Sequence, residues 1–200
     1  MPGKTSQTRD FNNDEILKTE FEYIARTAFQ ADEDHARVSS LFLVAVGSLI
    51  AALFSTQFFN NSNNSVFIAW AFGGLFFILT LLGTLTMLQL SRLRAAWYDS
   101  MLAMNQLKDY WIHHSEAGDL MKAFKWDTKT LPAKYKLNSV SFFQAVEVAL
   151  LSGITFGAAV YFLQKGIAYA CPSCNWAYTI SFGILIFFFE LWLYKLNLGK

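Results

Sequence analysis

Four long apolar runs alternate along the chain with polar segments. The runs cover residues 39–59, 66–90, 140–163 and 177–193. About 20 apolar residues in a helix cross a hydrocarbon layer about 30 Å thick. Each run therefore predicts a transmembrane helix. The expected fold class is all-α, a polytopic membrane protein with four transmembrane helices.

The basic residues between the runs predict the orientation in the membrane. Lys and Arg gather before the first run and between the second and third runs, whereas the connection between the third and fourth runs carries only Lys165. Segments rich in Lys and Arg stay in the cytoplasm. We therefore expect a multi-pass protein of the cell inner (plasma) membrane, with both termini and the long middle segment in the cytoplasm.

The polar flanks of the first two runs carry a heptad pattern of apolar residues. Spacings of three and four residues recur before the first run and after the second, as is typical of helices that pack along a seam. The seam residues are Leu17, Phe21 and Ile24, followed by Leu93, Trp97, Met104, Leu107 and Trp111. The seams predict packing either on each other or on a neighbouring subunit.

These patterns divide the chain into five parts. Residues 1–13 are expected to be disordered, and residues 14–114 to hold the first two spans with their extensions into a cytoplasmic helical stalk. Residues 115–138 are expected to form a cytoplasmic loop, residues 139–196 a hairpin of the third and fourth spans, and residues 197–200 a tail.

Glu147 and Glu190 are the only acidic residues inside the apolar runs. Ionisable groups within a membrane are costly and tend to face protein or water. With Gln144, Thr155 and Thr179 on the same helices, they predict a polar lining for a pore or vestibule. The alternative is a structural role, in which either acid pairs with Arg92 or Arg94.

Small residues predict close helix packing. Ala149, Gly153 and Gly157 recur at every fourth position of the third run, and Gly47 and Ala51 form a weaker stripe in the first. Such stripes allow helix backbones to approach each other in lipid.

Cys171 and Cys174 form a candidate disulfide in the outer connection. The sequence shows no catalytic motif, so the chain is not expected to be an enzyme. It also predicts no metal site and no cofactor.

Over residues 14–114, a cytoplasmic helix enters a span, a tight outer turn follows, and the next span leaves as another cytoplasmic helix. This layout resembles the SLATT-type and SMODS-associated four-transmembrane effector proteins of prokaryotic defence systems. The resemblance implies a role in antiviral defence. It also implies an oligomeric pore-former that permeabilises the inner membrane when a cytosolic sensor triggers it.

The expected function is therefore an ion-conducting pore or membrane-permeabilising effector, gated or assembled through its cytoplasmic helices. Its expected partners are the lipid bilayer, further copies of the chain and a soluble cytoplasmic protein. A net charge of +1 without a basic stripe argues against a nucleic-acid partner. The alternatives are a non-conducting scaffold or accessory subunit that docks a soluble partner, and a small transporter.

Overall fold

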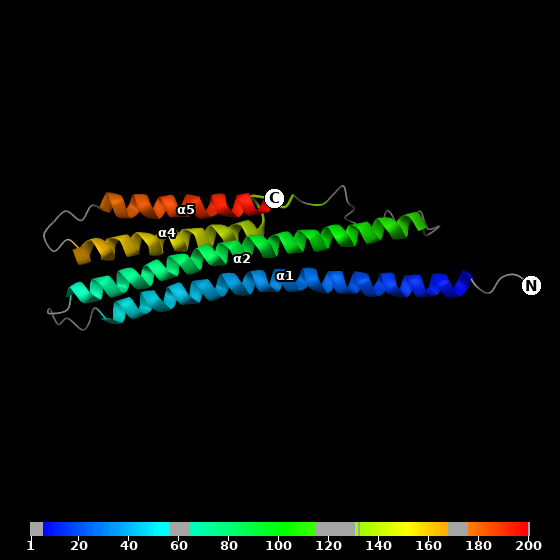
Figure 1. Cartoon of the computed structure of the whole chain (residues 1–200), viewed down its shortest axis with the longest axis horizontal. Helices are drawn as coiled ribbons and strands as arrows, with labels where there is room; N and C mark the ends of the chain where they lie inside the picture. The colour runs from blue at the N-terminus through cyan, green and yellow to red at the C-terminus, as the bar shows by residue number, and fades with distance from the viewer. Residues whose placement is uncertain (1–5, 57–64, 115–130, 132, 168–175, 200) are drawn as a thin grey trace, which may run out of the picture. The chain divides into compact units, whose positions relative to one another are not determined.

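The computed structural model describes residues 6–56, 65–114, 131, 133–167 and 176–199. These residues form four helices and, among them, no strand: α1 (Ser6–Thr56), α2 (Ser65–His114), α4 (Val140–Ile167) and α5 (Trp176–Leu198) (Figure 1). Each helix contains a stretch that is long and apolar enough to cross a bilayer, with mean hydropathy from 1.6 to 2.2. The expected all-α class with four candidate spans is thus confirmed.

The helix boundaries follow the sequence pattern closely except at the start of α1. This helix begins at Ser6, eight residues before the expected start at Asp14, so part of the segment expected to be disordered is helical. No Pro or Gly lies between these two residues. Once a helix is nucleated, each added residue contributes one further hydrogen bond, which favours its extension.

The chain divides into two compact units. Unit 1 comprises Met1–Asp34 and Leu93–Lys134, and unit 2 comprises His35–Arg92 and Tyr135–Lys200. Helices α1 and α2 contribute residues to both units, whereas α4 and α5 belong to unit 2 alone.

In unit 1, α1 and α2 run antiparallel and side by side (Figure 1). The rings of Phe21 and Trp111 lie 6.3 Å apart, centroid to centroid. A groove of about 360 Å³ runs between the helices, and Leu17, Ile24 and Leu107 contribute to its walls. The seams of one chain therefore face each other here. Of the remaining seam residues, Met104 is buried and Leu93 and Trp97 are half-buried.

Lys134 holds the end of unit 1 against α2. Its Nζ lies 3.4 Å from the Asp99 carboxylate and 5.1 Å from the centroid of the Tyr98 ring. Its carbonyl oxygen accepts a hydrogen bond of 3.4 Å from Nε of Arg94, whose guanidinium also stacks over the Trp97 ring. Lys134, which follows the connection that leaves α2, therefore packs back on α2 itself.

In unit 2, α2 and α4 pack closely along several turns. A Cβ atom on Gly73 would lie 2.9 Å from the Leu163 side chain, and one on Gly166 would lie 2.8 Å from Nε1 of Trp70. Farther along, Gly83 leaves room for the hydroxyl group of Ser152. These pairs follow one antiparallel register, so they define which residues of α2 and α4 lie level with each other.

Helices α4 and α5 touch at their backbones. A Cβ atom on Gly153 would lie 2.7 Å from the carbonyl oxygen of Gly183, and one on Gly157 would lie 3.2 Å from that of Thr179. Ala149 is fully buried on the same stripe. The small residues of the third run therefore pack α4 on α5 of the same chain, as small residues do between membrane helices.

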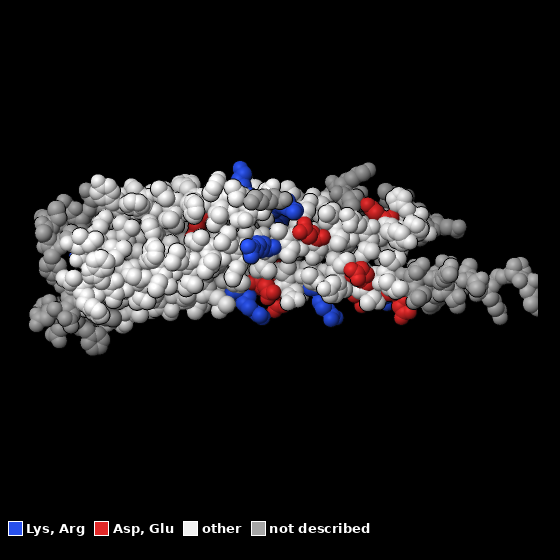
Figure 2. Space-filling view, in the orientation of Figure 1, with Lys and Arg blue, Asp and Glu red and all other residues white. Residues whose placement is uncertain are grey.

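Charged side chains are unevenly spread over the surface. In the face that Figure 2 shows, the end of unit 2 where α1 ends and α2 begins carries no Lys, Arg, Asp or Glu. Large apolar side chains are exposed on all four helices of this unit, among them Phe54, Phe67, Ile154 and Phe188. A surface of this kind suits contact with lipid.

We expect Gly183→Val to destabilise unit 2 by about 1–3 kcal/mol, because the added side chain would force apart two backbones that now touch. The thermal unfolding midpoint of the detergent-solubilised protein measures this loss. Gly74→Val is the matched control, since a Cβ atom at Gly74 would meet nothing within 4 Å. Equal midpoints for the two variants would contradict the α4–α5 contact.

Candidate functional site

Polar side chains gather inside unit 2, where α2, α4 and α5 meet. The hydroxyl groups of Thr80 and Thr155 lie 3.1 Å apart, and Oγ1 of Thr84 donates a hydrogen bond of 3.0 Å to Oε1 of Glu190. Thr80, Thr155 and Glu190 are all buried. This cluster joins three helices by hydrogen bonds within the apolar part of the chain.

Glu190 is the only acidic residue of the cluster, and its side chain is completely buried. The hydroxyl of Ser152 also faces its carboxyl group. Within the described residues, neither that hydroxyl nor Oε2 of Glu190 makes a hydrogen bond. Glu190 makes no ion pair with Arg92 in the described part of unit 2. Its polar contacts are the hydroxyl groups of Thr84 on α2 and Ser152 on α4. Glu190 therefore links α5 to its neighbouring helices inside unit 2.

Glu147 lies in a different environment from Glu190. It is exposed on α4, and it makes no hydrogen bond or ion pair with the described residues. Gln144 and Thr179 are half-buried. The two acids predicted to share one polar lining therefore differ in burial: Glu190 lies inside unit 2 and Glu147 on its surface.

The outward face of α1 carries a row of hydroxyl groups. Ser40, Ser48 and Ser55 are exposed, and each donates a hydrogen bond of 2.8–2.9 Å to the carbonyl oxygen three residues earlier. Their hydrogens thus point into their own helix. The oxygen lone pairs remain free to accept from whatever lies outside.

Two small residues belong to the same face. Gly47 has nothing within 4 Å of a Cβ position, and Ala51 is exposed. At about 100° per residue, they share a sector about 100° wide with the three serines and with exposed Val44. The opposite side of α1 holds buried Phe42 and Val46. We call the three serines, Gly47 and Ala51 the outward α1 face; the sequence indicated its two small members, and only the structure shows that they lie on an uncovered side of the helix.

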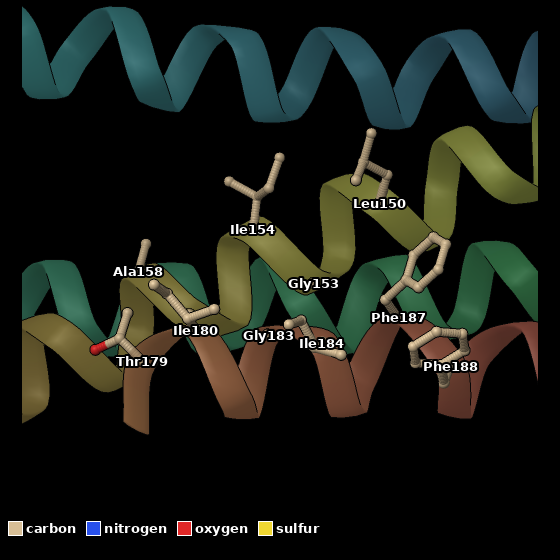
Figure 3. A pocket seen from close by; sticks show the side chains of 11 residues that line it. Leu150, Gly153, Ile154, Ala158, Thr179, Ile180, Gly183, Ile184, Phe187 and Phe188 are labelled. Atoms are coloured by element: carbon tan, nitrogen blue, oxygen red, sulfur yellow. The ribbon is translucent and has the colours of Figure 1, made fainter. Parts of the chain in front are cut away.

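An apolar groove of about 510 Å³ lies along α4 and α5. Leu150 and Ile154 rise from α4, and Ile184 and Phe188 line it from α5 (Figure 3). Its floor is the glycine contact between the two helices. Because its lining is almost wholly apolar, the groove offers no group for chemistry on a substrate.

No family model, curated protein or solved structure matches this chain significantly. The candidate disulfide residues Cys171 and Cys174 lie outside the described residues.

We expect Thr84→Val to lower the free energy of unfolding by about 1–3 kcal/mol, because the buried Glu190 carboxyl group would lose its hydrogen-bond donor. Thr84→Ser keeps the hydroxyl and should lose less. Adding Glu190→Met to Thr84→Val should recover part of the loss, since both polar partners are then removed. Thermal unfolding midpoints test this order, and equal midpoints for the Val and Ser variants would contradict it.

Proposed function

We propose that the chain assembles as a homo-oligomer in the cell inner (plasma) membrane and forms an ion-conducting, membrane-permeabilising pore. The outward α1 face lines the pore, and the paired helices of unit 1 lie in the cytoplasm and gate or assemble it. Glu190 then supports the protomer from inside rather than lining the pore.

The outward α1 face is the observation that carries this proposal. Its serine hydroxyls already donate to their own helix, so they present oxygen acceptors outward. Oxygen acceptors that line a pore can replace the water around a cation. Lipid chains carry no hydrogen-bond donors for these oxygens, whereas the water in a pore supplies them.

The position of this face explains why the pore needs several copies. The outward α1 face points away from the buried side of its own helix, so one protomer cannot enclose it. Copies arranged around a common axis would bring their α1 faces together at that axis. The resemblance to SLATT-type effectors implies an oligomeric pore-former that a cytosolic sensor triggers, which agrees with assembly from several copies.

A second candidate function is a scaffold or accessory subunit that docks a soluble protein. The groove in unit 1 favours it, because its walls combine apolar Leu17 and Ile24 with polar Glu20 and Gln106. Such a protein would retain its partner during gentle purification and would conduct no current. The two functions are therefore separated by a conductance measurement.

We expect Ser48→Cys, in a Cys171→Ser/Cys174→Ser background, to conduct in planar bilayers and to lose most of its current to a water-soluble thiol reagent. The reagent reaches this position only if the outward α1 face meets water. Ser181→Cys is the matched control, because Ser181 is exposed on α5 and would face lipid. Its current should not change.

Two outcomes would contradict the proposal. An absence of current from the reconstituted wild-type protein would rule out the pore. If the reagent blocked the current of Ser181→Cys but not that of Ser48→Cys, α5 rather than α1 would line the pore.

A further inference from the structure

Glu147 lies in the middle of an apolar face of α4. Val140, Phe143, Leu150 and Ile154 are more than half exposed, and with Glu147 they follow spacings of three and four residues. They therefore form one stripe along the helix. The bilayer provides no partner for a carboxylate in such a stripe, which makes an exposed acid there costly.

The contacts between α2 and α4 show which groups lie at the depth of Glu147. Thr80 lies beside Thr155, and Gly83 beside Ser152. Continuing this antiparallel register places Glu147 level with the position just before Gln89. Arg92 lies about one helical turn away, or about 6 Å along the axis.

At this depth, helix α2 exposes a face whose polar and apolar residues complement those of the α4 stripe. Gln89 and Arg92 are exposed, and within the described residues Arg92 makes no hydrogen bond or ion pair. The same face continues away from Arg92 with exposed Leu85, Leu82 and Ile78. Leu85 lies level with Leu150 of the α4 stripe, so these two apolar residues oppose each other, and Arg92 lies about one helical turn from the level of Glu147.

The directions of the side chains bring these two charges closer together. Side chains on a helix lean toward its N-terminus. Glu147 therefore leans toward the start of α4, and Arg92 toward the start of α2. Because the two helices are antiparallel, the carboxylate and the guanidinium lean toward the same depth from opposite sides.

We propose that the α4 stripe docks on the α2 face of a second copy, with Glu147 paired to Arg92 and Gln89 of that copy. This inference rests on the proposed homo-oligomer and specifies its interface. Rotation about an axis along the membrane normal keeps every residue at its depth. Glu147 therefore meets those groups of a neighbour that lie level with it.

Two other exposed cations of unit 2 lie near this depth. One is Arg37, because the Phe42 ring lies against Gly83 together with Ser152. The other is Lys195 on α5, whose Nζ lies 5.9 Å from the centroid of the Tyr135 ring. Arg37 already makes an interaction within its own chain. This difference favours Arg92 as the partner, and it supplies a control.

A charge exchange tests the pair. Glu147→Arg or Arg92→Glu alone should weaken assembly by at least ~10-fold, as expected for an interfacial charge left facing a like charge. The double variant Glu147→Arg/Arg92→Glu should restore assembly to within ~3-fold of the wild type. Glu147→Arg combined with Arg37→Glu should not restore it. Subunit counting by photobleaching in liposomes measures the assembly.

Cross-linking provides a test that does not depend on altered charges. Leu85→Cys and Leu150→Cys, carried on separately tagged chains without Cys171 and Cys174, should form an interchain disulfide. Leu41→Cys is the control partner for Leu150→Cys. Leu41 is exposed on α1 at a similar depth and should form none.

The outcomes separate this interface from the pore. A wild-type oligomer that is insensitive to charge reversal, or that cross-links through Leu41→Cys instead of Leu85→Cys, would overturn the interface and leave the pore proposal standing. A wild-type monomer in liposomes would overturn both.

Discussion

The close antiparallel packing of α2 on α4 determines where every polar group of unit 2 lies. Glycines at three points of this contact let side chains from the opposite helix approach the backbone, and the Thr80–Thr155 contact continues the same register. Polar groups buried among apolar helices need partners at the same depth. A shift by one residue would rotate Thr84 away from Glu190. The register is thus held jointly by steric fit and by the need to satisfy a buried carboxyl group.

Much of the fold was predictable from the sequence, because the length of an apolar run and the absence of Pro and Gly suffice to predict long helices. The boundaries of α2, α4 and α5 lie within a few residues of the expected ones. The different surroundings of Glu147 and Glu190 were not predictable. Periodicity shows which residues share a face, but a helix that is apolar all round does not reveal which face is covered.

The same limit applies to the small-residue stripes. Gly153 and Gly157 form a contact between α4 and α5 of the same chain, whereas Gly47 and Ala51 remain exposed. The two stripes are similar as sequence patterns, since both allow close approach of backbones. Only the position of α5 against α4 shows that the α4 stripe is covered within the chain. The α1 stripe remains exposed.

The backbone contact between α4 and α5 also bears on how the chain is made. Its partners, Gly153 and Gly183, are separated by one short connection and need nothing from α1 or α2 to meet. Local contacts of this kind form early, because little chain entropy is lost in closing the loop. Helices α4 and α5 can therefore pair with each other as they enter the bilayer. This pair can then pack on α2 as one unit.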